Sequence, residues 1–156
     1  MVEKVHIDGG SGKGSTFMTT AQVIQGLIKM IETGKVAEAA DIYSRCQEDI
    51  GYVLINKVQA DAQQQRVLAN LFYRARDYEK AALCCENLGE HEKAGKLYEQ
   101  SDDYASAAEM YAKVENFGKA AEMFERNQNF RQAAELYLKV KKYSRAAINY
   151  EKAVDY

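Results

Sequence analysis

The sequence contains no proline, and its three cysteines, Cys46, Cys84 and Cys85, form no CxxC pair. A chain of 156 residues without proline favours uninterrupted helices and disfavours proline-bearing turns and edge strands. An odd number of cysteines without metal-ligand spacing indicates reduced, structural thiols in a cytosol-like compartment. We therefore expect an all-α, cytoplasmic protein with no metal site.

Long apolar runs and an excess of one charge are also missing. The sequence has 21 Lys+Arg against 23 Asp+Glu, and its net charge of -2 provides no electrostatic footprint for nucleic acid or an anionic membrane. Its first residues include Glu3, Lys4, His6 and Asp8, where a secretory signal needs an apolar segment. From these absences we expect that neither nucleic acid nor a membrane is a partner of this protein.

An internal repeat organises the chain from Arg76 onward. Six blocks of 13 residues align without a gap: RDYEKAALCCENL, GEHEKAGKLYEQS, DDYASAAEMYAKV, ENFGKAAEMFERN, QNFRQAAELYLKV and KKYSRAAINYEKA. Positions three and ten of each block are mostly aromatic, and positions six and seven are alanine in all blocks but one, which has Ala94-Gly95. These positions share one helical stripe, so we expect the aromatic residues to pack in a core around closely approaching helices.

Each block predicts one short helix followed by a tight turn. Position two holds a good N-cap residue at Asp77, Asp103, Asn116 and Asn129. Helices of about ten residues are unstable alone and must bury their stripe against chain neighbours. Upstream, residues 19–33, 34–46, 48–62 and 63–75 continue the pattern less regularly, with Gly51 interrupting the third. We expect about ten antiparallel helices, stacked as helical hairpins.

A finer alternation appears at position thirteen. Leu88, Val114 and Val140 alternate with Ser101, Asn127 and Ala153. The resulting period of two blocks predicts two layers of helices, as a hairpin array requires.

The stretch "NLFYRARDYEKAALCCENL" resembles the junction of a tetratricopeptide repeat (TPR) unit. A small residue and an aromatic end one helix, "DY" begins the next, and alanines and a further bulky residue follow. The resemblance covers nearly all of residues 21–156. It departs from the 34-residue TPR unit, since the hairpin period is 26 residues and the unit's proline is missing. The similarity is to shorter TPR-like arrays, and it implies an α-solenoid that binds a protein or peptide partner.

The start of the chain, "GGSGKGST", looks like a phosphate-binding loop but fails the motif. With Gly12 and Lys13 in register, the motif needs glycine at Ile7 and a hydroxyl residue at Gly14. We therefore interpret residues 1–18 as a Gly/Ser-rich leader and 19–156 as the TPR-like repeat domain, with regular blocks from 63. Because Val2, Val5 and Ile7 alternate, we further hypothesise that part of the leader is extended and lies on the helices. A nucleotide-dependent switch is the least favoured alternative.

No Ser-His-Asp or Cys-His set is recognisable, so we expect a non-enzymatic protein without a cofactor. His6 and His91 are too far apart to suggest a ligand cluster. Most tyrosines occupy repeat positions three and ten, which favours packing over base stacking. The resemblance places the partner groove on exposed positions of one helix layer, taken as the blocks starting at 63, 89 and 115. The candidate groove residues are Arg66, Asn70, Tyr73, Arg74, Lys96, Gln100, Glu122 and Arg126.

The last residues, "VDY" at 154–156, restate the beginning of a further block. Repeat arrays normally end in an atypical helix with a polar outer face, which this pattern lacks. We expect either further repeats in a longer protein or stacking of this end on another chain. The sequence thus favours an adaptor or scaffold module. The alternative is a homo-oligomer formed through the N-terminal tail or the uncapped end.

Overall fold

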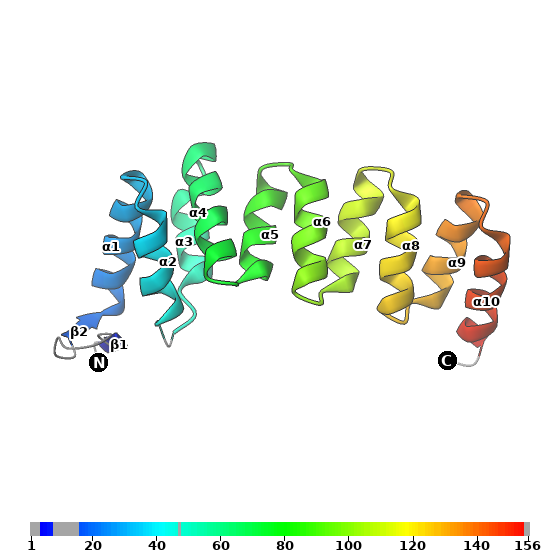
Figure 1. Cartoon of the computed structure of the whole chain (residues 1–156), viewed down its shortest axis with the longest axis horizontal. Coiled ribbons are helices and arrows are strands. Elements are labelled where there is room, and N and C mark those ends of the chain that lie inside the picture. Colours follow the sequence, from blue (N-terminus) through cyan, green and yellow to red (C-terminus); the bar gives the residue numbers. More distant parts are fainter. Residues whose placement is uncertain (1–3, 8–15, 47, 155–156) are drawn as a thin grey trace. The chain divides into compact units, whose positions relative to one another are not determined.

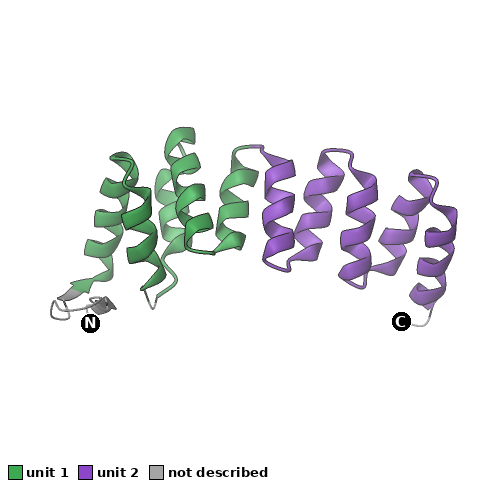
Figure 2. Ribbon diagram, in the orientation of Figure 1, with its two compact units in different colours: residues 1–88 green, residues 89–156 purple. Residues whose placement is uncertain are grey.

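The computed structural model describes residues 4–7, 16–46 and 48–154. Their helices form two compact units, residues 1–88 and residues 89–156 (Figure 2). The described residues contain ten helices (Figure 1). In unit 2 each helix packs against the next, whereas in unit 1 helices that are not consecutive also pack together. The predicted all-α, solenoid-like class is confirmed, with one two-stranded hairpin as an addition.

Unit 1 begins with the hairpin. Strand β1 (Lys4–Ile7) pairs antiparallel with β2 (Thr16–Thr19), and Val5 is opposite Met18. The extended conformation predicted for Val5 and Ile7 is therefore confirmed, with β2 as the hydrogen-bonded partner and α1 in contact. Val2, Lys13 and most of the glycine-rich stretch lie outside the described residues.

Five helices follow in unit 1. They are α1 (Thr20–Glu32), α2 (Val36–Ser44), α3 (Gly51–Val58), α4 (Ala62–Arg74) and α5 (Tyr78–Asn87). A capping box between Thr19 and Gln22 begins α1. Helix α3 is shorter than the others, and it begins at Gly51 where the sequence breaks the repeat. Helix α2 packs against α1 and α4, and α3 packs against α4 and α5.

Unit 2 holds five helices of nearly equal length. They are α6 (His91–Gln100), α7 (Tyr104–Lys113), α8 (Phe117–Arg126), α9 (Phe130–Lys139) and α10 (Tyr143–Val154). Each packs on the next through the predicted alanine pairs, and Ala107, Ala120 and Ala133 are fully buried. The 13-residue block of the sequence is therefore one helix and its turn.

The turns share one backbone geometry at position one of each block. Gly89 has a φ of 72°, and five non-glycine residues there also adopt positive φ: Arg76, Asp102, Glu115, Gln128 and Lys141. The next residue's N–H then donates to the carbonyl of position ten, for example Lys142 to Tyr137 at 2.8 Å. Caps begin the helices at position two, where Asp77, Asp103 and Asn116 accept the expected N–H bonds. Asn129 makes no such bond.

The predicted core is correct at position ten in four of the six blocks, with Phe124 half-buried, and only partly correct at position three. Tyr98, Tyr111 and Tyr137 are buried, whereas Tyr78, His91, Tyr104, Phe117 and Phe130 are half-buried at the edge of the stack. Helix α10 differs most: Tyr143 is 65% exposed and Tyr150 is 39% exposed. The reason is that no described helix covers this side of α10. Position thirteen does not follow the predicted alternation in burial, since Val114 is exposed.

Candidate partner-binding surface

The first four predicted groove residues lie together on helix α4 in unit 1. Arg66, Asn70, Tyr73 and Arg74 are all exposed and share one face of the helix. The Arg74 Nε–H donates to the side-chain Oδ1 of Asn70 at 3.2 Å, which orders both side chains. Tyr73 is 51% exposed, and its ring packs edge-to-face with that of Tyr78, with the two ring centres 5.7 Å apart. An ordered arginine beside an exposed tyrosine is therefore the central feature of this surface.

A hollow of about 340 Å³ adjoins this face between α2 and α4. It is lined by Ala37, Ala40 and Asp41 from α2 and by Arg74 and Arg76 from α4 and its turn. Asp41 is already paired with Arg45 at 2.9 Å on its own helix. Two guanidinium groups therefore border a shallow depression whose lining includes small residues of α2. We call this hollow, together with Arg66, Asn70, Tyr73 and Arg74, the α4 surface.

The other four predicted residues lie in unit 2 and do not form a comparable surface. Lys96 and Gln100 are on α6, and Glu122 and Arg126 are on α8. Lys96 pairs with Glu92 at 2.8 Å, and Arg126 pairs with Glu99 at 3.5 Å. Glu122 lies 3.8 Å from Lys142 and 3.9 Å from Arg145. Lys96 is therefore paired within its own helix, whereas Glu122 and Arg126 pair with residues of other helices and line a hollow together with Glu125 and Arg145.

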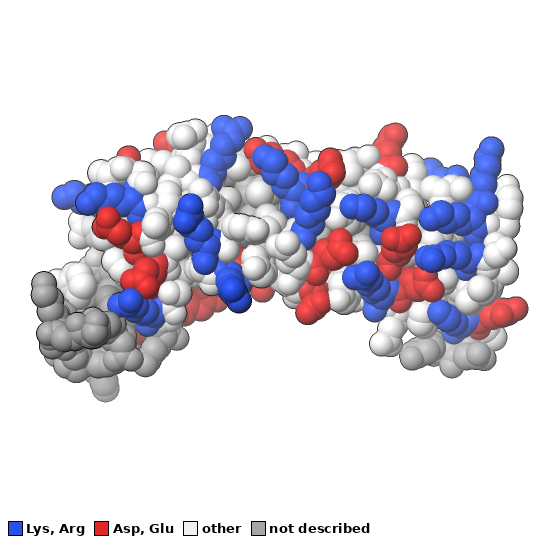
Figure 3. All heavy atoms as spheres, in the orientation of Figure 1, with Lys and Arg blue, Asp and Glu red and all other residues white. Residues whose placement is uncertain are grey.

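The charges of unit 2 follow a network that repeats every 26 residues. Glu99 accepts from Tyr111 at 3.2 Å and from Arg126; one period later, Glu125 accepts from Tyr137 at 2.9 Å and from Lys152 at 3.3 Å. These bonds join α6 to α8 and α8 to α10, so alternate helices of unit 2 form one layer. This pairing of alternate helices agrees with two helix layers in unit 2, whereas the alternation at position thirteen that suggested them is not seen in the burial. Figure 3 shows acidic and basic side chains interspersed over one face.

Cations also cover aromatic rings with the same regularity. Position twelve of one helix lies over position three of the preceding helix: Arg126 over Tyr104, Lys139 over Phe117 and Lys152 over Phe130. The Lys139 ammonium is 3.5 Å from the Phe117 ring centre. Such contacts contribute roughly 0.5 to 1 kcal/mol at exposed sites. They also explain why the position-three rings stay at the edge of the core, where a cation can reach them.

The network changes the pKa values of two of its members, Glu125 and Tyr111. Burial alone would raise the pKa of Glu125, but hydrogen bonds from Tyr137 and Lys152 outweigh it and hold the pKa below 4.5. Burial and the Glu99 carboxylate together raise the pKa of Tyr111 to about 12. Both groups therefore keep their ordinary charge states near neutral pH. They serve to hold the helices together.

Unit 1 has a different polar cluster, centred on a buried lysine. The Lys80 ammonium lies 3.2 Å from Asp49 and 3.2 Å from Asp77, and 4.9 Å from the centre of the Tyr52 ring. Burial opposes its charge, but the two carboxylates prevail and raise the pKa of Lys80. The Tyr43 hydroxyl donates to Asp77 at 2.6 Å. This cluster ties the irregular α3 segment to α2 and α5.

The cysteines are packed as small apolar side chains. Cys46, Cys84 and Cys85 form no disulfide, and the last two are buried. Burial raises the pKa of Cys84 to about 12, so its thiol is protonated at neutral pH. No group of three metal-binding side chains occurs in the described parts of the chain. Within the same residues, no helix has the length and apolarity to cross a membrane.

Sequence reasoning missed the hollow beside α4. Ala37, Asp41 and Arg76 come from two blocks that are far apart in the sequence, and only packing of α2 on α4 brings them together. One signal was available: residues 34–46 repeat the block pattern, which places Ala39-Ala40 on the packing stripe of α2.

No family model, curated protein or solved structure matches this chain.

Proposed function

We propose that this protein is a non-enzymatic, TPR-like interaction module of the cytoplasm that binds a protein or peptide partner on its α4 surface. The observation that carries the proposal is Tyr73, half-exposed beside the ordered Arg74 and the hollow between α2 and α4. Tyrosine and arginine are enriched among the few residues that dominate binding energy at interfaces. The chain would act as an adaptor or scaffold within a signalling or assembly system.

The chemistry of the α4 surface favours an acidic partner segment. Arg66, Arg74 and Arg76 present guanidinium groups on or beside α4, and Asp41 already has Arg45 as its partner. Guanidinium groups bind carboxylates in a bidentate manner, with geometric specificity. The small residues Ala37 and Ala40 in the lining of the hollow leave room for one small or apolar side chain. A peptide or helix with two carboxylates flanking an apolar residue fits these features.

A peptide-display selection against the immobilised chain tests this proposal. We expect enrichment of acidic sequences with one central apolar residue. The selected peptide should bind the double variant Arg66→Glu/Arg74→Glu at least roughly tenfold more weakly, because each lost charge-assisted contact is worth about 1 kcal/mol or more.

The matched control carries the same charge change elsewhere. Arg131 and Lys141 are exposed in unit 2, and Arg131→Glu/Lys141→Glu should leave the affinity within about twofold of the original. Equal losses in both variants would indicate general electrostatic attraction and would contradict a specific α4 surface. Selection of peptides without acidic residues would refute the proposed partner chemistry.

A further inference from the structure

Helix α10 presents an uncovered apolar stripe. Tyr143, Ala147, Tyr150 and Val154 recur at helical spacing on one face and are all exposed, with Val154 at 85%. Their counterparts on α9, Phe130, Ala134 and Tyr137, are covered by the neighbouring helix, and Ala134 is fully buried. The stripe therefore has the composition of an inter-helix contact, and no helix among the described residues completes it.

Helix α1 presents the complementary side of such a contact. Counted from its N-cap Thr19, Gln22 stands at position five and Lys29 at position twelve of a block. Helix α9 has the same residue types at these positions, Gln132 and Lys139. In α9 this side faces the preceding helix, because Lys139 covers Phe117 of α8 at 3.5 Å. In α1 Gln22 and Lys29 are exposed.

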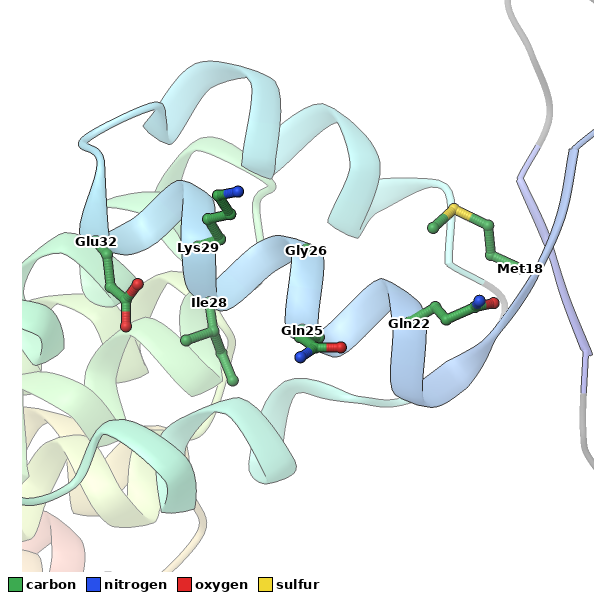
Figure 4. Close-up of a pocket in the computed structure, with 7 residues that line it drawn as sticks. All are labelled: Met18, Gln22, Gln25, Gly26, Ile28, Lys29 and Glu32. Carbon is green, nitrogen blue, oxygen red and sulfur yellow. The ribbon is translucent and has the colours of Figure 1, made fainter.

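The exposed side of α1 is also hollowed. A depression of about 680 Å³ runs along the helix and includes Gln22, Gly26 and Lys29 among its lining residues (Figure 4). Gly26 stands at position nine, where α9 has Leu136, and a Cβ added to Gly26 would meet no atom within 4 Å. The missing side chain leaves room for a bulky residue from outside. Tyr150 of α10, one hydroxyl larger than its counterpart Phe124 of α8, has the size to enter it.

We propose that two copies of this chain associate head to tail, with α10 of one copy packed against α1 of the next. The Lys29 ammonium would cover the exposed Tyr143 ring, as Lys139 covers Phe117 within unit 2. Tyr150 would fill the hollow beside Gly26. The contact is heterologous, because different surfaces of the two copies meet, and it can therefore add further copies. This inference is independent of the α4 surface.

Sedimentation velocity of the full chain from about 1 µM to several hundred µM tests the proposal, since a single helix-on-helix contact is small and gives weak association. We expect the average mass to rise with concentration. Ala147→Arg should abolish the rise by blocking the α10 stripe, and Gly26→Arg should abolish it by filling the hollow of α1. Circular dichroism checks that both variants keep their helices, which is expected because both positions lie on exposed helix faces.

Mixing Ala147→Arg with Gly26→Arg tests the head-to-tail arrangement directly. Each retains one intact surface, so the mixture should form a one-to-one dimer and nothing larger. Ala62→Arg, an identical change at an exposed alanine of α4, is the control for Ala147→Arg and should associate like the original chain. Lys29→Glu should weaken association at least tenfold, whereas Lys57→Glu in the last turn of α3 should not.

Three results would overturn the proposal. A chain that stays monomeric at every concentration has no such contact, and the stripe would then belong to another occupant, such as a further helical repeat. Association that is lost in Ala147→Arg but kept in Gly26→Arg would mean that α10 pairs with α10. Failure of the folded variants to form a mixed dimer would exclude the head-to-tail arrangement.

Discussion

Unit 2 repeats the same side-chain contacts every 26 residues, whereas unit 1 is held by contacts that occur once. In unit 2, Glu99 and Glu125 at position eleven each bind a tyrosine and a cation from other helices. In unit 1, position eleven of α4 is Tyr73, which is exposed beside Arg74. The difference teaches that the regular part of the array uses its charges for its own stability. The irregular part exposes Tyr73 and Arg74, and we propose that this surface binds another molecule.

The largest expected effect is at the buried tyrosines of unit 2. Tyr137 is fully buried among Ala121, Ala133 and Ala146, so Tyr137→Ala should lower the free energy of unfolding by about 3 to 5 kcal/mol. The adjacent Leu138 is exposed, and Leu138→Ala should cost only about 0.5 kcal/mol. Denaturant unfolding followed by circular dichroism measures both. Similar losses would contradict the assignment of position ten as the core of the repeat.

Replacing either of two glycines in unit 1, Gly51 or Gly26, by alanine should have opposite effects on stability. A Cβ at Gly51 would lie 2.1 Å from the Lys80 side chain and 2.7 Å from the Tyr43 hydroxyl, whereas one at Gly26 would meet nothing. Relieving this clash requires Lys80 to leave Asp49 and Asp77, so Gly51→Ala should destabilise by about 2 kcal/mol. Gly26→Ala should stabilise by about 0.5 to 1 kcal/mol, because alanine favours helix. Thermal unfolding compares them, and a neutral Gly51→Ala would refute the close approach.

These two sites show how far the sequence could predict the fold. Alanine pairs and position-ten tyrosines follow a period, so the buried faces of unit 2 could be predicted from spacing alone. The role of Gly51 could not, because it depends on Lys80 and Tyr43 from two other helices. The groove prediction was similarly limited. Positions along α4 were correctly expected to be exposed, but the hollow beside them depends on α2 packing.

The shared turn geometry offers a smaller test in both units. Arg76 in unit 1 and Lys141 in unit 2 adopt φ values of 62° and 60°, which glycine accepts without strain. Replacing either by glycine should raise the free energy of unfolding by about 0.5 to 1 kcal/mol. The opposite change, Gly89→Ala, should lower it by a similar amount. A gain in only one unit would show that the two units do not share this turn.

The smallest expected effect concerns pH and distinguishes the network of unit 2. Because the pKa of Glu125 lies below 4.5 in the folded protein, its stabilising effect is complete above that pH and is lost as the pH falls through the folded value. Glu125→Gln should cost less than about 1 kcal/mol at neutral pH and reduce the acid sensitivity of unfolding. Glu38→Gln, at an exposed ion pair of unit 1, should change that sensitivity less. Acid titrations at fixed denaturant measure the difference, and equal changes would argue against a special role for Glu125.

The most direct test of the central claim is to give unit 1 the residue that unit 2 has at position eleven. Tyr73→Glu places an acid where Glu99 and Glu125 stand, and it should alter stability little because Tyr73 is half-exposed. Titration of an acidic peptide selected against the original chain should show binding reduced at least roughly tenfold by Tyr73→Glu, since an anchor is lost and a like charge is added. The same change at the exposed Leu138 of unit 2 should leave binding unchanged. Undiminished binding to a folded Tyr73→Glu variant would contradict the α4 surface as the partner site.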